Sequence, residues 1–168
     1  ICIGFIIAAV LYVPPSQKPQ NEDYIDLEIE KPINTEIDIQ NTEEYVSPID
    51  FDKLKAQNPD IYGWIEIPGT KVDYPLLQHK RDDSYYLRYN VNGVRTSSGA
   101  IYTEATYNST DFNDKVTTIY GHRTVSDEMF GSLEAMYSSP NSIADHKEII
   151  IYLPDKELHY QVFAATRY

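Results

Sequence analysis

Hydrophobic and polar residues alternate on both sides of a tight turn in the first third of the folded region. Residues 64–67 read Trp-Ile-Glu-Ile and stop at Pro68-Gly69, and residues 72–77 resume an apolar pattern. Proline fixes φ at the second position of a type II turn, and glycine accepts the positive φ that the third position needs. The pattern therefore predicts two consecutive β-strands joined at Pro68-Gly69.

Further along the chain, strand patterns outnumber helical ones. We expect strands at residues 99–102, 116–120, 148–153 and 158–164, the last two around a turn at Pro154-Asp155, and a tight turn at Asn92-Gly93. The β-branched residues within 116–120 indicate a buried strand. The folded part, residues 51–168, is therefore predicted to be mainly β with flanking helices.

Two helices are predicted. The first begins near Phe51 and ends at Asn58-Pro59, because the residue before a proline is disfavoured in the α region. The second is capped by Ser126, with an apolar stripe at helical spacing. The residues of that stripe are Met129, Phe130, Leu133, Met136 and Tyr137.

The first thirteen residues are uncharged and almost wholly apolar. A bilayer-spanning helix needs roughly 20 such residues. Because the chain opens at Ile1 with no basic flank, we interpret residues 1–13 as the trailing part of a transmembrane signal anchor cut by the boundary of the sequence. The alternative is the core of a signal peptide, although no small-residue cleavage site follows.

Residues 14–50 form a second region with a different composition. They carry a net charge of −8 out of −12 for the whole chain, with five prolines. Like charge with few core residues does not offset the entropy of ordering, so we expect an extended acidic spacer. Regularly placed isoleucines offer an amphipathic helix as the alternative, which Pro32 interrupts.

Composition excludes several classes of function. The net charge of −12 argues against nucleic acid as a partner, because phosphate binding needs clustered Lys and Arg. The single cysteine, Cys2, cannot form an internal disulfide, and no metal-ligand spacing is present, so neither a metal nor another cofactor is expected. A calcium-dependent adhesive domain would rest on Asp82, Asp83 and Asp111, but their spacing does not match a calcium loop.

His122 is the residue with the most chemical promise. It follows the predicted strand at 116–120 and Gly121, and an imidazole at the exposed end of a rigid strand can exchange protons with a substrate. Spacing alone does not separate this role from that of an ordinary surface histidine.

Five ordered motifs resemble class B sortases. They are GWIEIPGTKVDYPLLQ at residues 63–78, YYL at 85–87, an Asn- and Gly-containing run at 90–102, TIYGH at 118–122 and MFGSL at 129–133. The resemblance runs from about Asn58 to the end of the chain. Glu104 stands where family members usually have aspartate, and Arg123-Thr124 stand where they commonly have Asn-Met.

The resemblance implies a sortase β-barrel, incomplete at the C-terminus. It also implies a cysteine transpeptidase that cleaves the C-terminal sorting signal of secreted proteins through a thioester and transfers them to a peptidoglycan amine. His122 maps onto the proton donor and base, and Leu87 onto the substrate groove. The family's catalytic cysteine and arginine lie in later strands, and neither Cys2 nor Arg123 replaces them, so residues 1–168 alone are predicted to be inactive.

The implied location is the outer face of a Gram-positive type of membrane, reached through a single-pass anchor. The alternative function is a membrane-tethered binding or structural module that uses a sortase-like half-barrel without catalysis. The sequence continuing past Tyr168 would separate the two.

Overall fold

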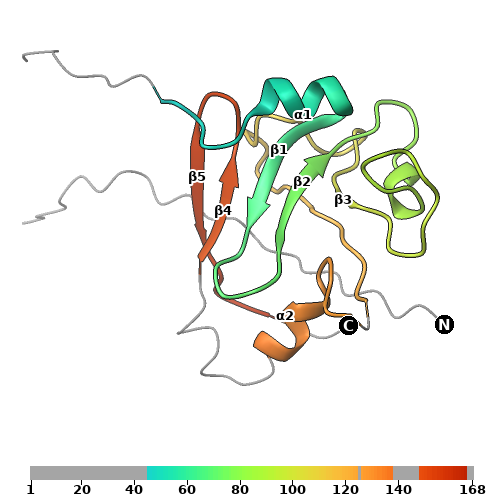
Figure 1. Ribbon diagram of the computed structural model, residues 1–168. Coiled ribbons are helices and arrows are strands. Elements are labelled where there is room, and N and C mark those ends of the chain that lie inside the picture. Colours follow the sequence, from blue (N-terminus) through green and yellow to red (C-terminus); the bar gives the residue numbers. More distant parts are fainter. Residues whose placement is uncertain (1–44, 125, 138–147, 166–168) are drawn as a thin grey trace, which may run out of the picture.

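A five-stranded sheet organises the part of the chain that the computed structural model describes, residues 45–124, 126–137 and 148–165. Its order is β3 (Ile101–Tyr102), β2 (Asp73–Leu77), β1 (Ile61–Glu66), β4 (Glu148–Tyr152) and β5 (Glu157–Gln161). Neighbouring strands are antiparallel except β2 and β3, which are parallel. Figure 1 shows β1, β2, β4 and β5 side by side. The predicted mainly β fold with flanking helices is confirmed, although the sheet is open and does not close into a barrel.

The hairpin of β1 and β2 forms as predicted. Gly69 has a φ of +81°, and the Ile67 amide donates to the Val72 carbonyl over 2.9 Å to close the turn. The register pairs Glu66 with Asp73 and Ile65 with Tyr74. Along β1, Ile61 and Ile65 are buried whereas Trp64 and Glu66 are partly exposed, so one face of the hairpin belongs to the core.

The first predicted helix is also confirmed. Helix α1 (Phe51–Gln57) starts at Asp50, whose carboxylate accepts a hydrogen bond from the Lys53 amide over 3.0 Å. It ends at Asn58, which is extended with a φ of −148° before Pro59. The helix packs beside β1 (Figure 1) and buries Phe51.

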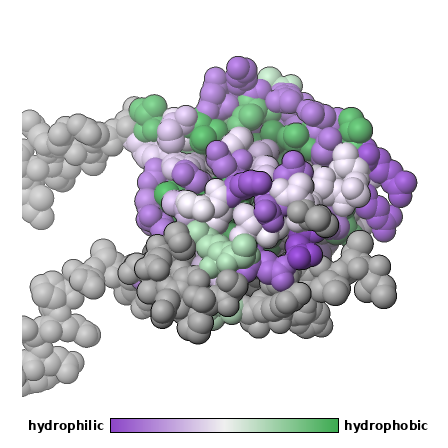
Figure 2. Space-filling view, turned by 60° about the horizontal axis from the view of Figure 1, so that its bottom comes forward, coloured by the Kyte–Doolittle hydropathy of each residue, from purple (hydrophilic) through white to green (hydrophobic). Residues whose placement is uncertain are grey.

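Two clusters of buried side chains form the core. The larger joins β1, β2, β4 and α2 (Gly131–Met136), with Leu76, Ile151 and Leu133 near its centre. The smaller joins β1, β2 and β3 to the short 3₁₀ helix η1 (Tyr85–Leu87), through Ile61, Leu77 and Tyr86. On the face shown in Figure 2, hydrophobic surface is divided into separate patches among hydrophilic residues. Most of the driving force for folding therefore lies in these two clusters.

The predicted strand at 116–120 is wrong. Only Tyr120 pairs with the sheet, through an isolated bridge to Tyr102, and Val116 is 54% exposed. The buried Asn108 side chain forms hydrogen bonds with the backbone of this segment instead. Its amide donates to the Val116 carbonyl over 2.9 Å, and its oxygen accepts from the Thr118 amide over 3.1 Å. Those groups are the ones that a neighbouring strand would otherwise use.

The second helix is present but starts later than predicted. Helix α2 begins at Gly131, and Asp127 and Met129 have positive φ values, of +60° and +51°. The Ser126 hydroxyl forms hydrogen bonds with the side chains of Thr124 and Glu128, and it does not cap α2. A bridge between Arg123 and Met129 requires a tight reversal in this segment, which a helix from Ser126 would prevent. The apolar stripe still packs, since Phe130 and Leu133 are buried and Met129 and Tyr137 lie against the core.

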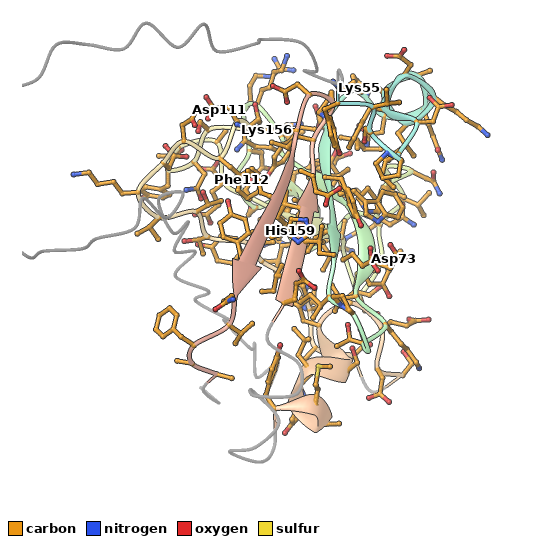
Figure 3. The ribbon with its side chains drawn as sticks, turned by 90° about the vertical axis from the view of Figure 1, so that its left-hand side faces the viewer. Lys55, Asp73, Asp111, Phe112, Lys156 and His159 are labelled. Carbon is orange, nitrogen blue, oxygen red and sulfur yellow. The ribbon has the colours of Figure 1, made fainter. Side chains whose placement is uncertain are left out.

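Strands β4 and β5 form the last predicted pair and carry a charged cluster on an exposed face. His159 contacts Glu148 through Nδ1 at 2.7 Å and Glu157 through Nε2. Figure 3 shows His159 on the face of these strands that is turned to the viewer. Hydrogen bonds that the His159 ring donates to Glu148 and then to Glu157 raise the pKa of His159.

Some predictions fall outside the described residues. They include the anchor at 1–13, most of the spacer at 14–50, and Cys2. Within the described residues, no helix has both the length and the apolar character needed to cross a bilayer.

We predict that Asn108→Ala destabilises the domain by about 1–3 kcal/mol, because two backbone groups lose a buried partner. The Thr118 amide should exchange with solvent much faster, whereas the Tyr120 amide, held by the Tyr102 carbonyl, should change less. Chemical denaturation and amide hydrogen exchange measure both effects. Equal acceleration at both amides would show that Asn108 has no specific role in this segment.

We predict a pH-dependent contribution from His159. Because its pKa is raised in the folded state, the stabilisation is fully present below the pKa of the unfolded chain, near 6.5, and is lost as pH rises through the higher folded value. The side chains are about half exposed, so the effect is about 0–1 kcal/mol. His159→Gln should lower the melting temperature more at pH 5.5 than at pH 8.5, and an equal decrease at both values would contradict the assignment.

Candidate active site

His122 lies at the point where the chain leaves the sheet. It follows the bridge between Tyr102 and Tyr120, and its ring is partly exposed. Its Nε2 lies 2.8 Å from the carbonyl oxygen of Leu87, which is the last residue of η1. The Leu87 side chain is 38% exposed. The structure thus brings together the two residues predicted to belong to the site, which are 35 positions apart.

The backbone of His122 is held on its other side. Its carbonyl accepts a hydrogen bond of 3.0 Å from the amide of Phe130, just before α2. The next residue, Arg123, bridges Met129 and forms an ion pair with Glu134 through Nε. The loop after His122 is therefore closed back on itself, and Arg123 is engaged away from the imidazole.

Gly121 allows the chain to enter this position. A Cβ at residue 121 would lie 2.4 Å from Cδ1 of Ile101 and 2.7 Å from Cδ2 of Phe130, both of which are buried. The backbone therefore packs directly against two core side chains one residue before the imidazole. Any side chain at 121 would move His122 or the core.

Two stacked tyrosines lie next to this segment. The rings of Tyr102 and Tyr120 stack with centroids 5.3 Å apart, and the Tyr120 hydroxyl donates to Glu104 over 3.2 Å. Burial, and then the charge of Glu104, raises the pKa of Tyr102 to about 12 and also raises the pKa of Tyr120. Both phenols are therefore neutral near pH 7 and serve packing and orientation. Glu104, at a position where the family usually has aspartate, is the acceptor that orients Tyr120.

A network of polar side chains holds the segment that precedes His122. The buried hydroxyl of Tyr62 lies 2.9 Å from Oγ1 of Thr103, and the side chain of Gln78 donates to Thr103 Oγ1 and to the Asn108 carbonyl. Burial raises the pKa of Tyr62. These contacts fix Asn108, which in turn holds residues 116–118.

The described residues do not complete a catalytic set. They contain no cysteine, and no group of three or more His, Cys, Asp or Glu side chains among them is placed to hold a metal ion. The aspartates considered for calcium have local partners: Asp82 accepts from Ser84, Asp83 from the Thr106 amide, and Asp111 from Ser109. The arrangement provides one orientable proton carrier beside an exposed leucine.

Sequence reasoning missed the residues that position His122. Asn108 lies between predicted elements, where no periodic pattern marks it. Gly121 was visible in the motif before the histidine, but its close packing depends on Ile101 and Phe130, which are distant in sequence. The contact itself uses the Leu87 carbonyl, an atom that every residue type possesses.

Comparison with known proteins gives a consistent result, although no protein-family model matches the chain. Sortase B of Listeria monocytogenes is 40% identical over 80 residues, which cover 48% of this chain and 32% of that protein. Sortase B of Staphylococcus aureus is 32% identical over 126 residues, covering 75% and 49%. The chain is similar to class B sortases over part of their length. It spans about a third of the length of the first relative and about half of the length of the second.

Solved class B sortases share the fold of the described domain. The sortase B of Bacillus anthracis in complex with AAEK1 matches with a TM-score of 0.63 at 30% identity, covering 70% of this chain and 56% of that one. Spy0129, a Streptococcus pyogenes class B sortase involved in pilus biogenesis, matches with 0.63 at 31%, covering 69% and 63%. A Staphylococcus aureus sortase B–substrate complex matches with 0.60 at 30%, covering 72% and 54%. Partial coverage agrees with a resemblance to part of the sortase domain.

We predict that Gly121→Ala destabilises the domain by about 1–3 kcal/mol through overpacking against Ile101 and Phe130. The double variant Gly121→Ala/Phe130→Leu should recover part of the loss, because a smaller side chain at 130 makes room for the new methyl group. Denaturant unfolding of both single variants and the double variant measures the coupling. Strictly additive effects would show that the two positions do not compete for space.

Proposed function

We propose that the chain is part of a membrane-anchored cysteine transpeptidase of the class B sortase type. The observation that carries the proposal is the position of His122, partly exposed and oriented by the Leu87 carbonyl at the end of the TIYGH motif. The sequence and fold similarity to sortases B supports the reaction class.

In this proposal the enzyme cleaves the C-terminal sorting signal of a secreted protein and joins the protein to a cell-wall amine. A cysteine thiolate attacks the signal's carbonyl, giving a thioester that the amine resolves. His122 protonates the departing amine and then accepts a proton from the arriving one. The exposed Leu87 side chain contacts the sorting signal. A sorting-signal peptide as partner is supported by the substrate complex described for one of the similar sortases.

The nucleophile has no counterpart near His122 in the described domain. The only cysteine of the 168 residues is Cys2, in the apolar run at 1–13. A polypeptide limited to residues 1–168 is therefore proposed to be inactive. Residues 1–13 would anchor the enzyme as a single-pass membrane protein, and the acidic residues 14–50 would hold the domain on the extracellular side.

One observation favours a second candidate function, a membrane-tethered binding or structural module. No cysteine lies within the described residues, so these residues alone are compatible with a sortase-like fold that has no catalysis. Reading the coding frame past Tyr168 separates the candidates. A strand with a Thr-Cys pair followed by a strand with an arginine supports the enzyme, and a stop codon supports the module.

The activity test uses the product of the whole reading frame and a fluorogenic sorting-signal peptide. His122→Ala should lower kcat about 10²- to 10⁴-fold, the range for losing a general acid–base group. His159→Ala is the matched control, because His159 lies in a charged cluster on the exposed strand face of β4 and β5, and it should retain activity.

The same assay applied to residues 1–168 should give no turnover. Turnover by this polypeptide that His122→Ala abolishes would show that the nucleophile lies within it. Full activity of the whole protein with His122→Ala would refute the role of the imidazole.

A further inference from the structure

The ring of His122 makes one hydrogen bond within the described part of the chain, and its acceptor is a backbone carbonyl. Nε2 lies 2.8 Å from the Leu87 oxygen, and none of the described residues partners Nδ1. We propose that the Leu87 carbonyl, held in place by Gly99, keeps His122 protonated at Nε2, so that Nδ1 is the atom that exchanges protons. This inference rests on the proposed transpeptidase function and makes residue 87 a positioning residue for His122.

The chemistry of the two partners fixes the direction of the bond. A carbonyl oxygen can only accept, so the nitrogen facing it carries hydrogen. A neutral imidazole has one N–H, and Nδ1 therefore holds the lone pair. With the ring turned over, a carbon would face the carbonyl and the hydrogen bond would be lost.

The proton balance follows from this tautomer. When His122 acts as a base, the incoming proton adds to Nδ1 and the ring becomes a cation with hydrogen on both nitrogens. When it acts as an acid, the proton on Nδ1 moves to the departing amine nitrogen as that carbon–nitrogen bond breaks. Nε2 keeps its hydrogen and its bond to Leu87 through both steps, so the ring does not reorient.

The Leu87 carbonyl is itself held by its neighbours. The carbonyl before it, of Tyr86, accepts from the Ala100 amide over 2.9 Å, and the carbonyl after it, of Arg88, accepts from the Thr96 amide over 2.8 Å. Residues 86–88 are therefore attached to the loop at 96–100 on both sides of Leu87. The orientation of the acceptor is a property of this backbone.

Gly99 is the residue of that loop that packs against the Leu87 carbonyl. Its φ is +55°, and a Cβ there would lie 2.2 Å from the Tyr86 oxygen and 2.9 Å from the Leu87 oxygen. Gly93, in the turn that precedes this loop, has a φ of +70°, but a Cβ there would meet only the Tyr85 hydroxyl, at 3.7 Å. Both glycines adopt a left-handed conformation that would strain an alanine, but only Gly99 lies against the Leu87 peptide.

The first test is nitrogen-15 NMR of residues 1–168 labelled on histidine, with His122 assigned by comparison with His122→Gln. In the neutral ring, the chemical shifts should show hydrogen on Nε2 and a lone pair on Nδ1. A one-bond Nε2–H signal should be visible, because the hydrogen bond slows exchange with water. Hydrogen on Nδ1, or no observable Nε2–H signal, would overturn the proposal.

The second test compares Gly99→Ala with Gly93→Ala. Gly99→Ala should abolish the Nε2–H signal, since the carbonyl must move, whereas Gly93→Ala, which adopts the same left-handed conformation without a backbone clash, should retain it. If Gly99→Ala does not fold, Thr96→Val is the milder variant, because it removes the hydroxyl that accepts from the Gly99 amide over 3.1 Å. Retention of the signal in a folded Gly99 or Thr96 variant would show that this loop does not hold the carbonyl.

These measurements need no catalysis, so they separate the two proposals. Loss of activity on His122→Ala in the whole protein, together with hydrogen on Nδ1, would leave the function standing and refute the positioning role. Hydrogen on Nε2 in a whole protein that tolerates His122→Ala would do the opposite.

Discussion

Two backbone hydrogen bonds between Tyr102 and Tyr120 determine where the chain places His122. The amide of each residue donates to the carbonyl of the other, over 3.0 and 2.8 Å. Tyr102 belongs to β3, which is paired with the hairpin through β2, so the bridge ties an otherwise irregular segment to the core of the sheet. Two residues later the chain presents His122. An imidazole placed so close to a rigid bridge has little freedom of position.

The parts of the fold predicted correctly from sequence are those governed by local stereochemistry. Gly69 adopts the positive φ that its turn requires, and Asn58 ends α1 in an extended conformation before Pro59. The β1–β2 hairpin and the β4–β5 pair follow from alternation and turn residues. In each case the decisive residues lie within a few positions of one another, so one short stretch of sequence contains the whole cause.

The wrong predictions concern segments whose structure depends on a residue outside the predicted element. Residues 116–120 have strand propensity, but the Asn108 side chain occupies their backbone groups, and this competitor lies outside the run. Ser126 has the chemistry of a helix cap, but Met129 bridges Arg123, and the reversal delays α2 to Gly131. Similarly, His122 and Leu87 were identified separately through family resemblance, whereas their contact depends on tertiary structure. Local propensity was overridden where a partner outside the predicted element supplied a competing contact.

A comparison of His159 with His122 shows what a backbone acceptor provides. His159 lies between Glu148 and Glu157, and these carboxylates raise its pKa because they stabilise the protonated ring. His122 instead faces the uncharged carbonyl of Leu87. A carbonyl orients the ring without adding a full negative charge beside it, which matters in a chain whose net charge is already −12. A proton carrier must both gain and lose its proton, and a partner that strongly favours the cation hinders the loss. In the proposed function His122 must work in both directions, and its uncharged acceptor is compatible with that role, whereas the carboxylate partners of His159 contribute to stability.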